Sequence, residues 1–212
     1  EATTLNVTTA GGGIFVNDLS GGVAVGLVTA IGGAVNLTAT GGNLTDAALD
    51  ALVNVTGGTV NLTTTGAGTV GTAATAAATL EVEATTLNVT TAGGDIFVND
   101  LSGGVAVGAI TAVGGNVTLT ATGGSITDAG ADGLVNITGG TLNLTVTGAG
   151  TVGTSAALGD TLEIEATTLN LTTAGGSAFV TDLSGGLTVG AINTLGGNLT
   201  LATTGNLAIG TI

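Results

Sequence analysis

Fourteen carboxylic acids are the only side chains in this 212-residue sequence suited to acid–base chemistry, because Lys, Arg, His and Cys are absent. Two pairs of them, Glu81 with Glu83 and Glu163 with Glu165, each flank a single apolar residue. If that apolar residue faces inward from a β-strand, both carboxylates face outward, about 7 Å apart. Inverting glycosidases use two carboxylates at such a separation.

A polysaccharide-degrading enzyme is nevertheless the least favoured hypothesis for these pairs. The sequence has 3 Phe and no Trp or Tyr, so it lacks an aromatic platform for a sugar ring, and it has no cation for an acidic saccharide. The pair also recurs, whereas a catalytic site is normally unique. We expect no enzymatic activity and no cofactor. A loosely bound Ca²⁺ or Mg²⁺ and a solvated acidic face are the remaining interpretations of each pair.

A second recurring acid is an aspartate within the segments NDLSGG, NDLSGG and TDLSGG, where it stands at Asp18, Asp100 and Asp182. An aspartate beside a turn usually accepts hydrogen bonds from nearby backbone N–H groups. These three residues are also weak candidates for a divalent-cation site, although no segment matches an EF-hand loop.

The formal net charge of −14 excludes several partners. Without a cation the chain cannot neutralise phosphates, so we expect no nucleic-acid binding, and an anionic membrane surface would repel it. Membrane insertion by a helix is not expected, because no stretch approaches the ~20 apolar residues required. The hydrophobic content of 43% with only 7% charged residues also argues against disorder.

The sequence is a tandem repeat with a long period. EATTLNVTTAGG begins at Glu1 and again at Glu83, and EATTLNLTTAGG begins at Glu165. We therefore divide one continuous unit, 1–212, into a first repeat (1–82), a second repeat (83–164) and a partial third (165–212). Repeats of this kind stack on their neighbours, and the chain reads as a segment of a longer array.

A shorter pattern lies inside each repeat: alternating apolar residues, a Thr, then Gly-Gly or Gly-Ala-Gly. Alternation of period two indicates strands, and the glycines indicate corners. We divide the first repeat into coils 3–33, 34–58 and 59–84, each about 25–31 residues long with about three strands. The prediction is an all-β fold, a right-handed parallel β-helix (β-solenoid), with three coils per repeat and seven to eight coils in the chain.

The signature strands predict stacked columns. One inward column should contain Leu5, Val35, Val60, Leu87, Val117, Leu142, Leu169 and Leu199. Two outward polar columns should contain Asn6, Asn36, Asn61, Asn88, Asn143 and Asn170, with Thr at 118 and 200, and beside them Thr8, Thr38, Thr63, Thr90, Thr120, Thr145 and Thr172. Stacked Asn and Thr side chains can hydrogen-bond along a column.

The outward polar columns have two further interpretations. Asn-x-Thr is formally a glycosylation acceptor, although the strand pattern produces that tripeptide automatically. A flat Asn/Thr lattice could also bind ice or glycans. Phe15, Phe97 and Phe179 recur once per repeat. They either form an exposed row for lateral contacts, three coils apart, or turn into the core at a slipped register.

Segments such as GGNVTLTATGGSITD (114–128) and TLNLTVTGAGTV (141–152) resemble the repeats of giant bacterial exoproteins of the filamentous haemagglutinin type. The resemblance extends over the whole chain. It implies a long right-handed β-helical shaft, an extracellular or cell-surface location and a role in adhesion or surface structure. The leading hypothesis is thus a structural shaft that associates with itself, end to end or laterally. An ice-binding or glycan-binding face, with cell-surface glycans as partners, is the alternative.

Overall fold

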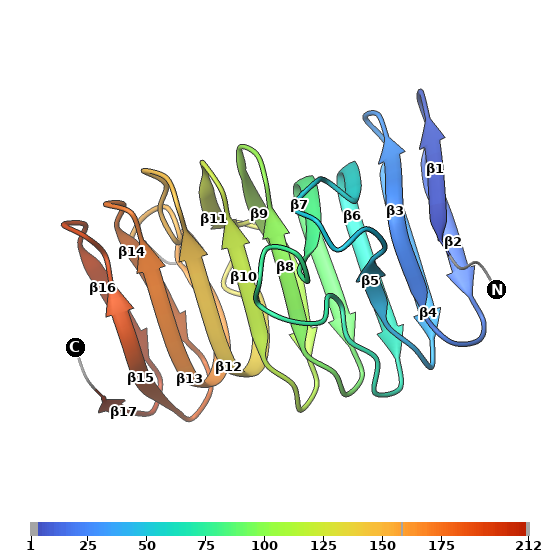
Figure 1. Ribbon diagram of the computed structural model, residues 1–212. Helices are drawn as coiled ribbons and strands as arrows, with labels where there is room; N and C mark the ends of the chain where they lie inside the picture. Colours follow the sequence, from blue (N-terminus) through green and yellow to red (C-terminus); the bar gives the residue numbers. More distant parts are fainter. Residues whose placement is uncertain (1–3, 158, 211–212) are drawn as a thin grey trace.

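The computed structural model describes residues 4–157 and 159–210, which form 17 strands and no helix (Figure 1). The strands of the first half are β1 (Leu5–Thr9), β2 (Ile14–Asp18), β3 (Val23–Ala30), β4 (Ala34–Thr40), β5 (Leu44–Asp46), β6 (Val55–Thr65), β7 (Leu80–Thr91), β8 (Ile96–Asp100) and β9 (Gly104–Ala112). The remaining strands are β10 (Val117–Ala121), β11 (Ser125–Asp128), β12 (Ile137–Val146), β13 (Leu162–Thr173), β14 (Ala178–Asp182), β15 (Gly186–Asn193), β16 (Leu199–Thr203) and β17 (Asn206–Ile209).

The strands pair in parallel and wind into a β-solenoid of about ten turns, as the alternating pattern predicts. Strands in the middle of the stack pair with the turn before and the turn after, whereas β1, β2, β16 and β17 at its ends pair with one strand each. One column of paired residues runs through nine successive turns: Val16, Leu37, Leu62, Val89, Ile110, Ile137, Ile164, Asp182 and Thr203. The elements therefore form one continuous shaft.

The coils are shorter than the sequence analysis predicted. Along this column the shortest turn runs from Ile164 to Asp182, and one of the longest runs from Ile110 to Ile137. The predicted coil lengths, the three coils per repeat and the seven to eight coils in all are therefore wrong, because one repeat makes about three and a half turns. The signature strands do not all stack on one another either: Leu5 pairs with Val25, not with Val35.

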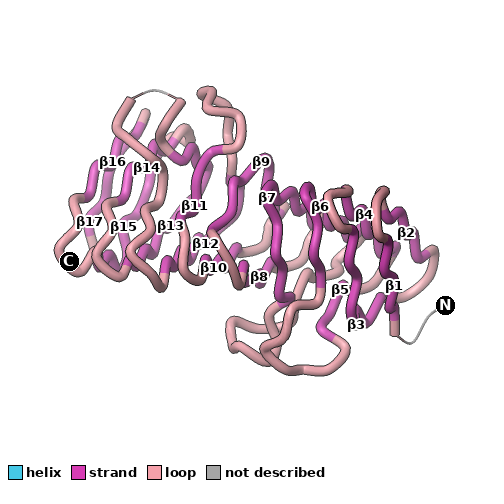
Figure 2. The backbone as a smooth tube through the Cα atoms, turned by 90° about the horizontal axis from the view of Figure 1, so that it is seen from above, coloured by secondary structure: helices cyan, strands magenta, loops and turns pink. Residues whose placement is uncertain are grey.

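The extra half turn places equivalent residues of successive repeats on opposite sides of the shaft. Val7 belongs to the column that continues through Val28, whereas its repeat equivalent, Val89, belongs to the nine-turn column. Figure 2 shows the result: the loops after β5 and β6 project from one side, and the equivalent loops after β11 and β12 project from the other. Any surface feature of the repeat therefore alternates between two sides.

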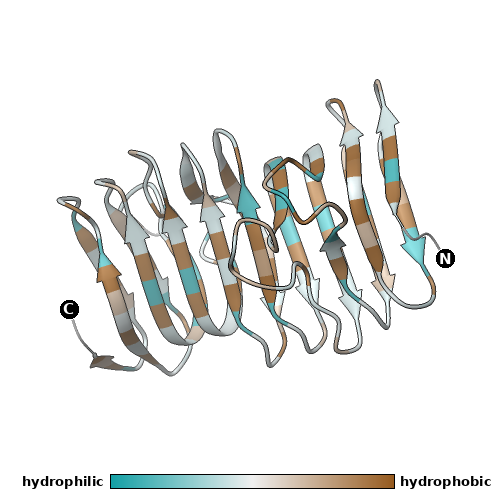
Figure 3. Cartoon of the chain, in the orientation of Figure 1, coloured by the Kyte–Doolittle hydropathy of each residue, from teal (hydrophilic) through white to brown (hydrophobic). Residues whose placement is uncertain are grey.

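The core consists of stacked aliphatic side chains. Inward and outward positions alternate along each strand, as in β4, where Val35, Leu37 and Ala39 are buried; Figure 3 shows this alternation as bands of hydropathy across the strands. The interior also holds threonines at corners, such as the fully buried Thr64, whose hydroxyl donates to the carbonyl oxygen of Gly68 at 2.7 Å. In the described residues, no helix is long and apolar enough to span a membrane.

Candidate functional sites: polar ladders and buried carboxyl groups

The outward asparagines form short hydrogen-bonded ladders, not one column along the shaft. In the first ladder, Asn88 Nδ2 donates to Asn61 Oδ1, and Asn61 Nδ2 donates to Asn36 Oδ1, each at 2.9 Å. The side chain below Asn36 is Phe15. The ladder ends where Asn88 Oδ1 accepts a hydrogen bond from the backbone N–H of Ala109 at 2.9 Å.

The second repeat builds the same ladder from Thr118, Asn143 and Asn170, with hydrogen bonds of 3.3 and 2.9 Å. It begins at Phe97, which pairs with Thr118, and ends on the backbone N–H of Ala191. Within the part of the chain that the structure describes, the Asn6 side chain has one hydrogen bond, the terminal contact in which its Oδ1 accepts from the N–H of Leu27.

The predicted continuous Asn column is therefore wrong, and a bulge explains why. The pairing of β7 with β9 shifts by one residue between Leu87 and Val89. At this bulge a Cβ on Gly108 would lie 2.2 Å from Asn88 Oδ1, so no further side chain can continue the ladder. The threonine columns break in the same way: Thr38, Thr63 and Thr90 are paired in one column, whereas Thr120, Thr145 and Thr172 form another. Thr8 pairs elsewhere, with Thr29.

We predict that the ladder contributes to stability through its middle residue. Asn61→Ala removes both hydrogen bonds of the first ladder and leaves half-buried amide groups unpaired, so the free energy of unfolding should fall by about 1–2 kcal/mol. Asn6→Ala, at an exposed position outside a ladder, is the matched control and should change it by less than about 0.5 kcal/mol. Urea unfolding followed by circular dichroism measures both. An equal effect of the two substitutions would contradict a stabilising ladder.

The recurrent phenylalanines all project from the core, but they do not form a row. Phe15 is 76% exposed, and Phe97 and Phe179 are half-buried at outward positions of β8 and β14. Because of the half-turn offset, β2 and β14 lie on one side of the shaft and β8 on the other (Figure 2). The predicted lateral row with a three-coil spacing is thus wrong.

The glutamate pairs differ from the prediction most clearly. Glu81 and Glu163 are fully buried, while Glu83 is half-buried and Glu165 is exposed. Glu81 does point away from the aliphatic core, but the chain covers it. The two carboxylates of a pair therefore do not face solvent together, and the geometry that suggested a glycosidase is not present.

A polar network surrounds Glu81. Thr79 Oγ1 donates to Glu81 Oε1 at 2.5 Å, and Glu81 Oε2 has no hydrogen-bond partner. On the preceding turn, Asn54 makes two bonds to the backbone of Glu81: its N–H donates to the Glu81 carbonyl at 2.9 Å, and its Oδ1 accepts from the Glu81 N–H at 3.0 Å. Asn54 Nδ2 in turn donates to Asp46 Oδ1 at 2.8 Å.

Asp46 organises the loop between β5 and β6, residues 47–54. Its Oδ1 accepts from the N–H of Ala48 at 2.9 Å, and its Oδ2 from the N–H of Asp50 at 2.8 Å. Asp50 Oδ1 accepts from the N–H of Leu52 at 2.8 Å. Both aspartates therefore stabilise the turn, and the negative charge of both disfavours ionisation of Glu81.

Removal from water raises the pKa of Glu81 to about 7, with Asp46 and Asp50 adding to the increase and the Thr79 hydroxyl opposing it. The second repeat reproduces the network. Glu163 is bonded to Thr161 and Asn136, its Oε2 is unpartnered, and burial again raises its pKa.

The aspartates of the NDLSGG segments turn into the shaft. Asp100 occupies an inward column between Val82 and Ala121 and is fully buried. Its Oδ1 accepts from the N–H of Ala84 at 3.3 Å, but Oδ2 has no partner. Burial raises the pKa of Asp100 to about 6.

Asp182 is equally buried but fully hydrogen-bonded: Ser184 Oγ donates to its Oδ1 at 2.7 Å, and Thr203 Oγ1 to its Oδ2 at 3.1 Å. The residue of the second repeat that corresponds to Thr203 is Ala121, which has no hydroxyl. This single difference explains the unpartnered oxygen of Asp100. Asp18, half-buried in β2, also has an unpartnered Oδ2.

The structure does not gather the acids proposed for a divalent cation. Within 4–157 and 159–210, no three Asp or Glu side chains come together in a group that could hold a metal ion. The acids are instead distributed along the shaft. Asp46 and Asp128 recur within LTDA and ITDA, and the backbone N–H bonds of Asp46 are those expected of an aspartate beside a turn. Sequence reasoning missed Asn54 and Thr79, because Asn54 and Glu81 lie on two successive turns and their contact depends on the strand register.

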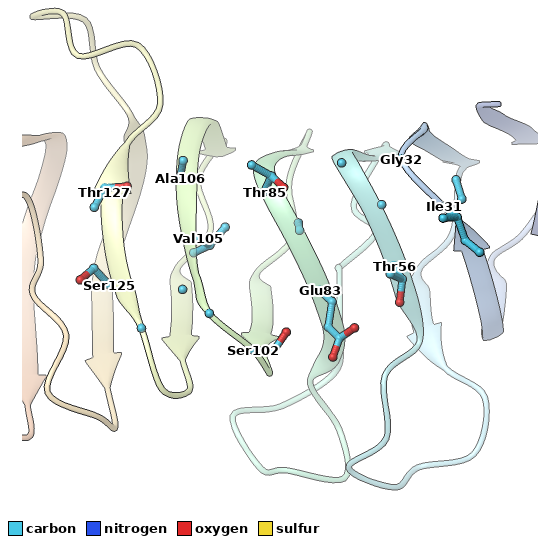
Figure 4. A pocket seen from close by; sticks show the side chains of 17 residues that line it. Ile31, Gly32, Thr56, Glu83, Thr85, Ser102, Val105, Ala106, Ser125 and Thr127 are labelled. Carbon is cyan, nitrogen blue, oxygen red and sulfur yellow. The ribbon is translucent and has the colours of Figure 1, made fainter. Parts of the chain in front are cut away.

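A shallow groove of about 820 Å³ crosses several turns of the first and second repeats (Figure 4). Gly57, Ala84 and Gly103 line it, and Glu83 and Ser102 supply polar atoms. A smaller groove of about 450 Å³ is lined by the equivalent residues of the next repeat, including Gly139, Glu165 and Ser184. Small residues on neighbouring strands leave this concave strip, and it recurs with the repeat.

Comparisons with protein-family models, with curated proteins and with solved structures found no match to this chain. The fold and the repeating sites together define the class: an acidic, tandem-repeat parallel β-solenoid.

Proposed function

We propose that the chain is a shaft segment of a giant extracellular or bacterial cell-surface fibre of the filamentous haemagglutinin type. The observation that carries the proposal is the uninterrupted stack of turns, in which one paired column runs from Val16 to Thr203. Each turn supports the next by backbone hydrogen bonds and buried aliphatic side chains. The sites formed by the described residues recur with the repeat. A structural role that depends on the length of the shaft therefore suits this chain better than a role that depends on one unique binding or catalytic site.

The exposed ends of the stack support self-association. Leu199, Leu207 and Ile209 of the last strands are 42%, 42% and 59% exposed, and Leu5 and Val7 of the first strand are only half-buried. These side chains occupy positions that are fully buried in the middle of the shaft. A neighbouring turn, from an adjoining repeat or a second copy, would cover them and pair with the free strand edges.

Counterions complete the proposal. Fourteen acids without a base, on a rod about 45 Å long at ~4.8 Å per turn, give a charge density that attracts Ca²⁺ or Mg²⁺ as loosely held counterions. Such ions would reduce the repulsion between neighbouring shafts. Cell-surface glycans remain proposed partners of the wider fibre.

The test is a series of tandem arrays with two, four and eight copies of the repeat unit 1–82. We predict that length, measured by electron microscopy and small-angle X-ray scattering, grows by about 17 Å per repeat, three and a half turns at ~4.8 Å, at constant cross-section. An array with randomised repeat sequence of identical composition is the control. A continuous shaft of this pitch would be ruled out if the cross-section grew with repeat number, or if the increment were about 14 Å, which corresponds to three turns at ~4.8 Å.

A further inference from the structure

Two buried glutamates, one per repeat, have no role in the proposed shaft. Glu81 and Glu163 are fully buried, and each has one carboxyl oxygen, Oε2, without a hydrogen-bond partner. An aliphatic residue would fill an interior position at lower cost, because burying an unpaired charge is far more costly than burying a neutral group.

No cation of the chain can neutralise these carboxyl groups, because Lys, Arg and His are absent. The ionisable groups of the preceding turn that act electrostatically on Glu81 are Asp46 and Asp50. On its own strand the nearest is Glu83, and its partner on the next turn is the neutral Asn99. Every charge around Glu81 is therefore negative.

The charges around Glu163 are also negative. Asp128 and Asp132 of the preceding turn both raise its pKa through their negative charge, and Glu165 lies two residues along its strand. Asp160 lies in the adjoining loop, and the partner on the next turn is the neutral Thr181. A proton is the species that fits a single unpartnered oxygen at each site.

Each glutamate is also attached to a projecting loop. The loop 47–54 is closed by Asp46 at its start and by Asn54 at its end, and Asn54 is bonded twice to the Glu81 backbone. The loop 129–136 is closed in the same way by Asp128 and Asn136, the latter bonded to Glu163. Ionisation of the glutamate adds a third negative charge, which is repelled by the two aspartates of its loop.

We propose that Glu81 and Glu163 are proton-operated latches: each holds the projecting loop of the preceding turn, 47–54 or 129–136, against the shaft when its carboxyl group is protonated, and releases it when ionised. The released loop carries Leu52 or Leu134, already 70% and 71% exposed, further from the shaft. Because the two loops lie on opposite sides, the latches act on both sides of the fibre.

The expected pH range follows from the linkage between protonation and opening. In the open loop Glu81 returns to its ordinary pKa of 4.5, whereas in the closed loop the pKa is about 7. A group whose pKa is raised in the closed state stabilises that state fully below the open-state pKa, and the stabilisation is lost as the pH rises through the closed-state pKa. The opening equilibrium constant should therefore rise by about tenfold per pH unit between these values and level off above them.

The experiment is amide hydrogen exchange of the full chain, resolved by NMR, at pH 4.5 and 7.5 and corrected for intrinsic exchange rates. In the wild-type chain the opening constant of loop 47–54 should increase by about a hundredfold at the higher pH, and that of loop 129–136 should increase as well. In Glu81→Gln the response of loop 47–54 should disappear while loop 129–136 still responds, and Glu163→Gln should show the reverse. Glu83→Gln, two residues away on the same strand, should preserve both responses.

Thr79→Val provides a second variant that retains the glutamate. Loss of the hydroxyl donor should move the response of loop 47–54 to higher pH, and this outcome does not depend on Glu81→Gln folding. The latch would be refuted if loop exchange did not change with pH, or if both loops responded equally in each glutamine variant. Restored protection at pH 7.5 upon adding Ca²⁺ at matched ionic strength would also overturn it, because the oxygen would then hold a metal ion instead of a proton.

Discussion

Gly68→Ala should destabilise the shaft by about 3 kcal/mol. A Cβ at Gly68 would lie 1.9 Å from the carbonyl oxygen of Gly42 on the preceding turn, and 3.1 Å from the Cβ of Thr64. Thr64 is held by its pairing with Ala39 and Thr91 on the two neighbouring turns, and the atom of Gly42 is a backbone oxygen. The added methyl group can therefore be accommodated only if two turns move apart. Separation of the turns would weaken the backbone hydrogen bonds at this corner as well as the packing.

Gly68 belongs to a column of corner glycines that includes Gly42, Gly94 and Gly115. A Cβ added to any of them would lie within 2.4 Å of the carbonyl oxygen of the corner glycine on the preceding turn. The second repeat has an equivalent column, in which a Cβ on Gly150 would lie 2.1 Å from Gly124 O. Gly150→Ala should therefore have a similar effect on the other side of the shaft.

Gly58→Ala is the matched control for this prediction. It lies on the same turn, and its Cβ would make an ordinary contact, 3.5 Å from Gly33 O. Its effect should stay below about 1 kcal/mol. Urea unfolding followed by circular dichroism measures all three variants. Equal stabilities of Gly68→Ala and Gly58→Ala would show that the turns are not held as close together as the backbone indicates.

Acidification from pH 7.5 to 4 should stabilise the shaft, and Asp100→Asn should remove about 2–3 kcal/mol of that gain. The buried Asp100 has a pKa of about 6 in the folded chain and an ordinary value of 3.8. Because the folded-state pKa is raised, its stabilising contribution is complete below pH 3.8 and is lost as the pH rises through 6. At pH 7.5 the neutral amide of the variant avoids a buried, partly unpaired charge, so Asp100→Asn should be more stable than the wild type.

The measurement is the free energy of unfolding in urea at several pH values between 4 and 7.5. Asp95→Asn, five residues earlier, is the control, since Asp95 is only half-buried and accepts hydrogen bonds from Asn116. Ala121→Thr tests the cause directly, because it supplies the hydroxyl that Thr203 gives to Asp182; we expect a lower pKa for Asp100 and a weaker pH dependence. The explanation would fail if Asp100→Asn left the pH dependence unchanged.

The local features of the fold could be predicted because strand alternation is a property of adjacent residues. Val35, Leu37 and Leu62 face inward and Asn36 and Asn61 face outward, as a period of two requires. The Gly-Gly corners could also be recognised. Glycine is needed there for a further reason, because successive turns approach closely at positions such as Gly68, and this reason depends on which turn lies next to the corner.

The number of residues per turn could not be predicted, because the pattern does not say which strands pair. Strand β3 has the same alternation as the signature strands, so Leu5 of β1 can pair with Val25 as well as with Val35. The choice is made by corner lengths and by the bulge between Leu87 and Val89, and these involve residues of several turns at once.

A parallel stack of strands with an aliphatic interior, an acidic chain without bases, and the long repeat that joins 1–82 to 83–164 all follow from the order of the residues. The span of about three and a half turns per repeat, which makes equivalent sites alternate between two sides, depends on how distant strands pair. The tertiary structure also decided that Glu81 and Asp100 are buried. Alternation indicates only which face of its strand a side chain projects from. Whether that side chain is buried depends on the loops and neighbouring turns that cover it.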